Sequence, residues 1–157
     1  MCTFKNIFPD IFNNCFEGAC PGATVMNPDE ASRKYSSMHR TCGQSRLDSP
    51  NAWCADVSAK GEWMQIDLGN VMCVNGVVTQ SRKDYNQRVT SYKVSYSADG
   101  QNFTELPQVY TGNDRFDNSK KTNNFKPVPA RYVRFIVQTY YGHPSMRAAV
   151  IGSATGY

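Results

Sequence analysis

The chain has 157 residues, enough for one domain that buries roughly 70% of the surface that its unfolded chain exposes. Hydrophobic residues at 40% and charged residues at 19% are typical of a folded globular protein and exclude a largely disordered chain. The formal net charge is +4, and no apolar run approaches the roughly 20 residues that a membrane-spanning helix needs.

The first 20 residues contain three cysteines and four phenylalanines but no periodic pattern. We therefore predict that residues 1–19 are a Cys-containing extension and that residues 20–157 form the domain. An extension of this kind either is stapled onto the domain or provides a contact between copies in a homo-oligomer.

Alternating hydrophobic and polar residues predict strands along most of the remaining chain. The segment 63–69 places Met64 and Ile66 on one side, the period-two pattern of a half-buried strand. Asp99 and Gly100 favour a tight hairpin turn, after which the chain should return antiparallel. No segment has a helical period with caps. Eight strands are expected, near residues 23–26, 63–68, 73–80, 89–97, 102–106, 123–127, 131–138 and 146–152.

Six segments occur in an order and spacing that resemble the discoidin domain, also called the coagulation factor V/VIII C-type domain. They are Trp53, WMQIDLG, TQSRKD, VTSYKVSYSADGQNFT, ARYVRFIV and MRAAVIG. Within that family, the pattern most resembles the slime-mould discoidin lectins. Short strands at this spacing indicate a β-sandwich, and the resemblance specifies an all-β, eight-stranded jelly roll. In this fold Trp53 is expected in the core, and Arg134 and Arg147 are expected to be structural.

Two loops carry most of the excess positive charge. Between residues 30 and 47 four cations face one acid, and the loop at 81–88 adds three cations against one acid. A basic surface attracts anionic partners such as sulfated or sialylated glycans and acidic phospholipids. Solvated loop charge explains the sequence equally well. The cations follow no nucleic-acid-binding motif, so no nucleic-acid partner is expected.

The number of cysteines indicates an oxidising compartment, and hence a secreted or extracellular protein. Fifteen pairings are formally possible among the six cysteines, which are Cys2, Cys15, Cys20, Cys42, Cys54 and Cys73.

The resemblance implies a different cysteine arrangement from that of many secreted relatives. In those relatives a cysteine near Cys20 pairs with one just after the last strand, where this chain has Ser153. Cys54 and Cys73 have counterparts in the slime-mould lectins, which work without such staples, so buried thiols are an alternative. Cys20 is then expected either to stay free or to pair with one of Cys15, Cys2 and Cys42.

The sequence contains none of the common catalytic motifs. It lacks a G-x-S-x-G elbow, an H-E-x-x-H helix, a Walker loop and a dinucleotide fingerprint. We therefore expect a non-enzymatic protein.

The resemblance implies that the ligand face is built by three loops, 27–52, 81–88 and 139–145, at one end of the sandwich. Arg82 and Asp84 match an Arg-Gly-Asp tripeptide of the slime-mould lectins, and an Arg fork beside an Asp acceptor can hold adjacent hydroxyls. The alternative is an Arg-Asp pair that only stiffens the loop. The full set of candidate ligand-binding residues is Tyr35, His39, Arg40, Arg82, Lys83, Asp84, Tyr140, Tyr141 and His143.

The third loop offers an aromatic platform around Gly142. Tyr140 and Tyr141 are suited to stacking on a sugar ring, but strand alternation sends one of them under the loop. His143 either donates to a sugar hydroxyl or caps a turn, and a turn is favoured.

Calcium is an open expectation. Some relatives hold calcium between the loop before Trp53 and a Glu on the last strand. Asp48 matches the first of these positions, whereas the second is Ala149. A calcium site needs six to eight oxygen ligands, so the missing carboxylate weakens it.

Together these features favour a carbohydrate-binding module for galactose or N-acetylgalactosamine type glycans or glycoproteins, acting in adhesion or recognition. The alternative is an adhesion module that binds membrane phospholipid or an extracellular protein. Apolar membrane insertion needs large apolar side chains at the loop tips, and Met38 and the tyrosines are the only ones expected there.

Overall fold

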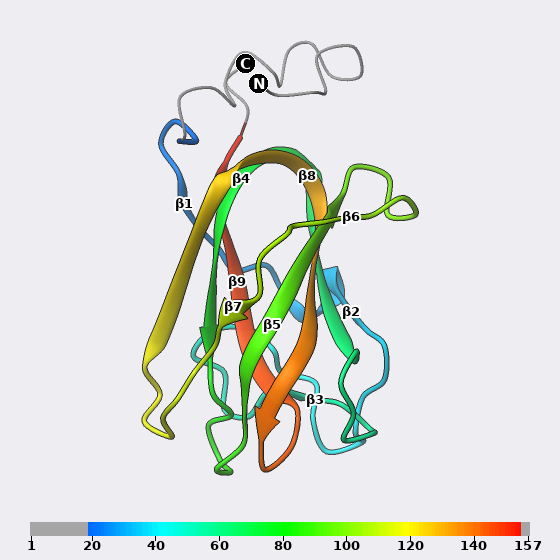
Figure 1. Ribbon diagram of the computed structural model, residues 1–157, viewed down its shortest axis with the longest axis vertical. Helices are drawn as coiled ribbons and strands as arrows, with labels where there is room; N and C mark the ends of the chain where they lie inside the picture. The colour runs from blue at the N-terminus through cyan, green and yellow to red at the C-terminus, as the bar shows by residue number, and fades with distance from the viewer. Residues whose placement is uncertain (1–18, 155–157) are drawn as a thin grey trace.

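The computed structural model describes residues 19–154, so the predicted extension, including Cys2 and Cys15, lies almost wholly outside the described residues. Within 19–154 the chain forms nine strands and one 3-10 turn, η1 (Glu30–Ser32), without an α-helix (Figure 1). In that same range there is also no helix long and apolar enough to cross a membrane. The strands are β1 (Thr24–Met26), β2 (Arg33–Tyr35), β3 (Trp53–Cys54), β4 (Trp63–Gln80), β5 (Arg88–Ser97), β6 (Thr104–Glu105), β7 (Tyr110–Thr111), β8 (Lys120–Tyr141) and β9 (Ser145–Ser153).

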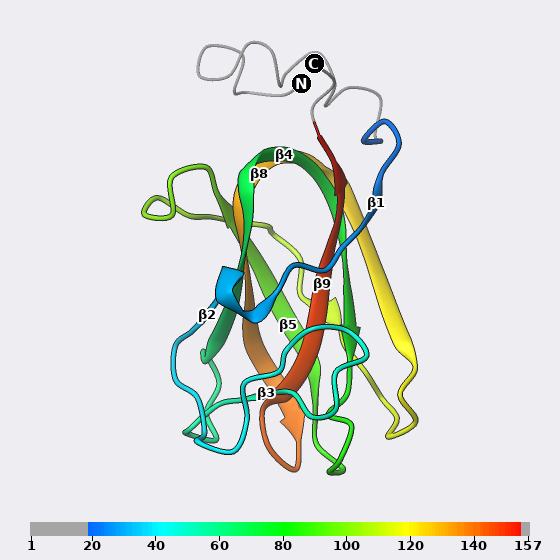
Figure 2. The same cartoon turned by 180° about the vertical axis from the view of Figure 1, so that it is seen from behind.

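The strands are antiparallel and run in the order β1-β9-β4-β8-β5-β6, while β2 pairs with β4, β3 with β9, and β7 with β5. The long strands β4 and β8 arch over together at the top of the molecule, so each contributes to both layers of the sandwich (Figures 1 and 2). The register between them shifts between Asp67 and Met72, and Gly69 in this stretch has φ +83°. Such an irregularity bends a strand without ending its pairing.

The all-β jelly-roll prediction is confirmed, but the strand boundaries differ. Segments 63–68 and 73–80, predicted as two strands, are the two arms of β4, and β8 likewise joins 123–127 with 131–138. The reason is that β4 and β8 are partners on both sides of the arch. The predicted loop 27–52 also contains the short strand β2.

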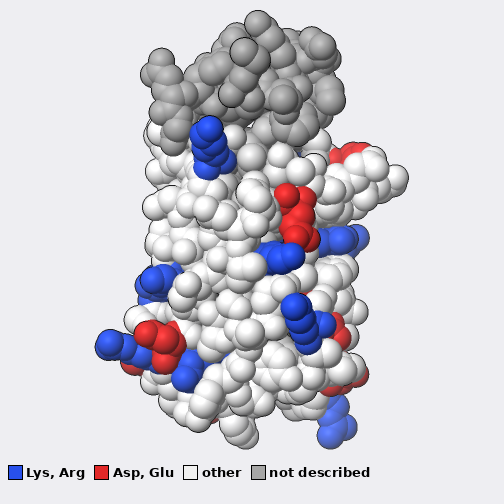
Figure 3. Space-filling model, viewed as in Figure 1, with Lys and Arg blue, Asp and Glu red and all other residues white. Residues whose placement is uncertain are grey.

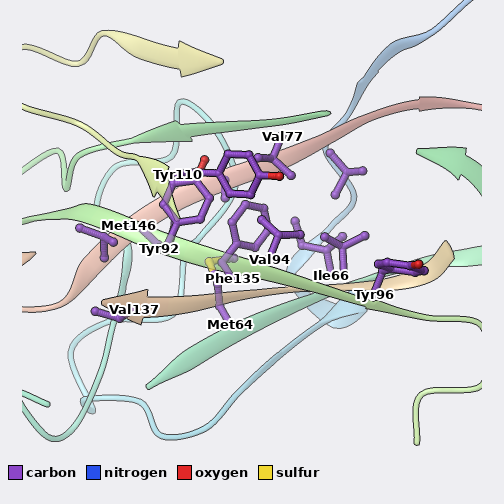
Figure 4. Close-up of a cluster of buried hydrophobic side chains, with 14 of the residues drawn as sticks. Met64, Ile66, Val77, Tyr92, Val94, Tyr96, Tyr110, Phe135, Val137 and Met146 are labelled. Carbon is purple, nitrogen blue, oxygen red and sulfur yellow. The ribbon is translucent and has the colours of Figure 1, made fainter. Parts of the chain in front are cut away.

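Alternate residues of the long strands point into one core between the layers (Figure 4). Met64, Ile66 and Phe135 are fully buried, and the rings of Tyr92 and Phe135 lie 5.7 Å apart between centroids. Trp53 is also fully buried, as predicted, and its indole N–H donates to the carbonyl of Ser37 at 2.8 Å.

The predicted hairpin turn is present. The hydroxyl of Ser97 accepts the N–H groups of Asp99 and Gly100 at 3.2 and 2.9 Å, and Gly100 has φ +78°. The chain then returns along β5, with Ser95 opposite Glu105.

Both cysteine expectations are wrong for the described residues. Cys20 pairs with Cys73, and Cys42 pairs with Cys54, so neither Cys54 nor Cys73 is a buried thiol. Cys73 lies directly opposite Ser153 in the β4–β9 register. The staple that relatives make to the position after the last strand is therefore made here to the neighbouring strand.

Candidate functional site

Five loops lie at the lower end of the molecule in Figure 1, opposite the β4–β8 arch. They are residues 36–52, 55–62, 81–87, 112–119 and 142–144. Parts of all three loops that the sequence predicted to form a ligand face are among them.

Arg147 on β9 holds three of these loops in place. Its guanidinium is fully buried and donates to the carbonyls of Ser81 and Ser49, each at 2.9 Å, and to the side-chain oxygen of Asn118. Burial lowers the pKa of Arg147. The structural role predicted for it is confirmed.

One hollow of about 340 Å³ lies where the loops meet, and we call it the primary pocket. It takes residues from the first, second and third predicted loops, which brings His39, Arg82 and His143 together. Its lining residues are His39, Thr41, Cys54, Arg82, Tyr85, Gln87 and His143.

Arg82 forms the floor of the primary pocket and is only 8% exposed. Its Nε donates to Asp84 at 2.7 Å, and its Nη1 donates to the side-chain oxygen of Gln87 at 2.9 Å and to the Sγ of Cys54 at 3.2 Å. Nη2 donates one N–H to Asp84 at 3.4 Å. Since a guanidinium has five N–H donors, one N–H of Nη2 has no acceptor among residues 19–154.

The three residues predicted as one ligand-binding group therefore differ in their contacts. Asp84 pairs with Arg82, and this hydrogen bond lowers the pKa of the Asp84 carboxyl. Lys83 is exposed and has no ion pair among residues 19–154.

The two histidines of the pocket are used differently. His143 is bonded through both ring nitrogens, Nε2 to the carbonyl of Ala55 at 2.5 Å and Nδ1 to the hydroxyl of Ser58 at 2.7 Å. It therefore holds the 55–62 loop, a role that neither the sugar-donor nor the turn-cap interpretation described. His39 is exposed and bonds Thr41 through Nδ1 at 2.8 Å, which leaves Nε2 facing solvent.

Tyr85 is the aromatic residue of the pocket, and it was not among the predicted residues. It is 59% exposed, and the guanidinium carbon of Arg82 lies 4.4 Å from its ring centroid. A stacked guanidinium holds the ring in a fixed orientation. The sequence signal was its place three residues after Arg82 in the predicted loop.

The remaining candidates do not line the primary pocket. Tyr35 stacks on Trp53 with 5.8 Å between ring centroids. Tyr140 packs against the core and donates its hydroxyl to Ser58 at 3.0 Å. Tyr141 is exposed but lies under the guanidinium of Arg88, 4.2 Å from its ring centroid.

The basic loops present fewer surface cations than the sequence suggests. Arg33 is buried and donates to the carbonyls of three segments, and Arg46 pairs with Asp29 at 3.0 Å. Lys34, Arg40 and Lys83 remain as exposed cations of these loops without an ion pair among residues 19–154. Figure 3 shows basic and acidic side chains interspersed over one face of the molecule.

The residues around Asp48 do not fit a calcium site. The carboxylate of Asp48 accepts from the ammonium of Lys120 at 2.7 Å and from the amide of Gln80 at 3.1 Å, and Lys120 lowers its pKa. Across residues 19–154 no group of three or more His, Cys, Asp or Glu is placed to hold a metal ion. A protein cation thus occupies the carboxylate that calcium would need.

Another hollow of about 390 Å³ lies beside the first loop, but it suits a sugar less well. Its charged groups already have partners: Glu30 accepts the backbone N–H of Arg46 at 3.1 Å, Arg46 pairs with Asp29, and Asp48 pairs with Lys120. It also lacks an aromatic ring. It is lined by Glu30, Gln44, Arg46, Leu47, Asp48, Ser49 and Pro50.

The nine strands of the described residues form a jelly-roll β-sandwich whose loops at one end surround a hollow. The sequence profile described as the F5/8 type C domain matches residues 30–150, so the chain belongs to the F5/8 type C, or discoidin, family. Lactadherin from Sus scrofa is 35% identical over 139 residues, which cover 74% of this chain and 34% of that protein. The chain thus spans about a third of the length of this relative.

Solved structures share the fold. Discoidin II from Dictyostelium discoideum superposes with a TM-score of 0.69 at 23% identity, over 84% of this chain and 58% of that chain. The Clostridium perfringens module CpGH89CBM32-5, solved in complex with GalNAc-β-1,3-galactose, superposes with a TM-score of 0.64 at 19% identity, over 82% of this chain and 99% of that chain.

Proposed function

We propose that the chain is a non-enzymatic carbohydrate-binding module that holds galactose or N-acetylgalactosamine type glycans in the primary pocket, in adhesion or recognition. The observation that carries the proposal is the convergence of three loops on one hollow. There a guanidinium N–H, an imidazole and an exposed tyrosine ring surround the same space. Sugar hydroxyls need such donors and acceptors, and the apolar face of a sugar ring stacks on an aromatic ring.

Two further observations support this proposal. The Clostridium perfringens module, which has the same fold, was solved with a GalNAc-containing disaccharide. The two disulfides in the described part of the chain suit an oxidising compartment, so we propose that the protein binds glycans or glycoproteins outside the cell.

The test compares substitutions of residues in the pocket with the substitution of a tyrosine outside it. We expect Tyr85→Ala to weaken binding of methyl β-galactoside by roughly three- to tenfold, because a stacking surface is lost. His39→Ala should also weaken binding. Tyr141→Ala, at a tyrosine of similar exposure that lies outside the pocket, should leave the affinity unchanged.

Isothermal titration calorimetry measures these affinities after a glycan array has selected the sugar. Thermal unfolding should be nearly unchanged in all three variants, because each residue is exposed. The proposal is wrong if the array shows no glycan binding, or if both pocket variants bind as the unsubstituted protein does.

A second candidate function is binding to acidic phospholipid membranes. The observation that favours it is a set of exposed apolar side chains on the loops of the same end. Val57 and Phe116 in this set were not predicted from the sequence. The set is Met38, Val57, Tyr85 and Phe116. Inserted apolar side chains supply much of the affinity of a protein that lies on a membrane.

Vesicle co-sedimentation tests this second function. Retention on phosphatidylserine vesicles but not on phosphatidylcholine vesicles, together with its loss in Val57→Asp, would support membrane binding. Equal behaviour of the two proteins would exclude a role of this loop tip in membrane insertion.

A further inference from the structure

A second hollow of about 280 Å³ adjoins the primary pocket, and Arg82 lines both. We call it the outer hollow. It lies between the 81–87 and 112–119 loops, which are neighbours at the lower end in both views (Figures 1 and 2). Small-ligand sites usually measure about 300–1,000 Å³, so each hollow suits one ring and the two together suit a longer ligand. The outer hollow is lined by Arg82, Lys83, Phe116, Asp117 and Asn118.

The 112–119 loop is held rigidly at both ends. The side-chain amide of Asn113 donates to the carbonyls of Thr79 and Ser119, each at 3.2 Å. The carbonyl of Asn118 accepts from the buried amide of Gln80 at 2.8 Å, and Asn118 keeps a positive φ of 67°. A fixed loop presents its side chains to a ligand at a low entropic cost.

Phe116 is presented by this rigid loop and is 48% exposed. An exposed aromatic ring beside a polar hollow suits a sugar. The apolar face of the sugar stacks on the aromatic ring, and the sugar hydroxyls form hydrogen bonds with the surrounding polar groups. The ring therefore gives the outer hollow the same kind of stacking surface that Tyr85 gives the primary pocket.

The charged groups of the outer hollow favour hydroxyls over a free anion. The ammonium of Lys83 has no ion pair among the described residues, and the Oδ1 of Asp117 accepts the backbone N–H of Ser119 at 3.0 Å. Hydrogen bonds from Ser119 lower the pKa of Asp117. Lys83 and Asp117 face the same space, and the third charged group there, Arg82, is already paired with Asp84, so a neutral ring with donors and acceptors matches the hollow better than a phosphate or a sulfate.

We infer that the two hollows form one extended site that takes at least two neutral sugar rings, with the second ring stacked on Phe116. The inference rests on the proposed function, because the first ring occupies the primary pocket. Lys83 and Asp117 then bond hydroxyls of the second ring.

The experiment compares a monosaccharide with disaccharides. Calorimetry with methyl β-galactoside, lactose and GalNAc-β-1,3-galactose should show that at least one disaccharide binds more tightly than the monosaccharide. Phe116→Ala should weaken that disaccharide by roughly three- to tenfold and leave the monosaccharide unchanged. Phe116→Tyr should keep the affinity, because the aromatic face remains.

Val109→Ala provides the control, since Val109 is an apolar residue of similar exposure that lies outside both hollows. It should leave both affinities unchanged. Circular dichroism of each variant shows whether the fold persists.

The outcomes separate this inference from the proposed function. If the monosaccharide binds but Phe116→Ala leaves every disaccharide affinity unchanged, the outer hollow is not a sugar site and the primary pocket still stands. The inference is likewise overturned if Phe116→Ala reduces only retention on phosphatidylserine vesicles, because Phe116 is then a membrane contact. If no sugar binds to the unsubstituted protein, the proposed function itself is wrong.

Discussion

Tyr92 is a residue whose burial has a consequence for alkaline stability. Its ring is fully buried in the core, and burial raises the pKa of Tyr92 to about 12. An unfolded tyrosine ionises near pH 10. Between these two values the unfolded chain releases a proton that the folded chain keeps, so the free energy of unfolding falls as pH rises. A difference of two pKa units corresponds to roughly 2–3 kcal/mol.

We therefore expect the urea midpoint to hold up to about pH 9 and to fall between pH 10 and 12. Tyrosine absorbance at 295 nm follows the ionisation in parallel. Tyr92→Phe preserves the packing on Phe135 and removes the titrating group, so its midpoint should fall less over the same range. An identical fall in both proteins would contradict this account.

The residues of the site show which part of the chemistry the sequence could reveal. Arg82 and His143 were predicted from their loops, and the structure brings them into one pocket. The local Arg82–Asp84 pair was foreseen as an alternative, but the bonds to groups distant in the chain were not predictable: Cys54 for Arg82 and Ala55 for His143. Tyr85 was missed because its position in the loop alone does not show which way its ring faces.

At the scale of elements, the disulfide Cys42–Cys54 connects the first loop to β3 directly beneath the primary pocket. It pins the segment that carries His39 and supplies the sulfur that accepts from Arg82. The disulfide Cys20–Cys73 lies away from the pocket. Cys73 follows the β4–β8 arch on β4 and is paired with Ser153 at the end of β9. The two bonds should therefore differ in what they control.

We expect one disulfide to contribute more to stability and the other to contribute more to glycan binding. The Cys20–Cys73 bond closes 53 residues and the Cys42–Cys54 bond closes 12, for which chain entropy gives about 4 and about 3 kcal/mol of stabilisation. The double Ser variant of Cys20 and Cys73 should lose more stability and keep its glycan affinity. The double Ser variant of Cys42 and Cys54 should lose less stability and weaken glycan binding.

Urea unfolding and calorimetry on the same samples measure both quantities. Parallel losses of stability and affinity in the two variants would show that Cys42–Cys54 has no specific role in positioning the pocket.

The strands show how far local patterns reach. Alternation predicted the core-facing residues of β4, β5 and β8, but parts of β4 and β5 are buried on both faces, so that Gln65 and Ser95 are buried as well. It divided β4 and β8 in two because the arch interrupts the pattern, while the pairing on both sides of it joins residues far apart in the sequence. The short strands β2, β3 and β7 have two or three residues each, too few for a period to be seen.

At the scale of the whole molecule, the two ends of the sandwich are stabilised by different carboxylates. Near the β4–β8 arch, Asp67 accepts two hydrogen bonds from Arg131, at 2.8 and 3.0 Å. At the loop end, Asp84 pairs with Arg82 and Asp48 with Lys120. In all three aspartates the partner cation lowers the pKa of the carboxyl below its ordinary value of 3.8.

Because each folded carboxyl has a lower pKa than the unfolded one, its contribution is present above about pH 4 and is lost as pH falls below that value. We expect the unfolding temperature to change little from pH 8 to 5 and to fall at lower pH. The domain should unfold in a single transition, since both layers share β4 and β8. Asp67→Asn removes one titrating group far from the pocket, so its difference in unfolding temperature between pH 7 and pH 3 should be smaller than that of the unsubstituted protein. Calorimetric scans at both pH values measure it, and an undiminished difference would mean that the Asp67–Arg131 pair contributes nothing to acid sensitivity.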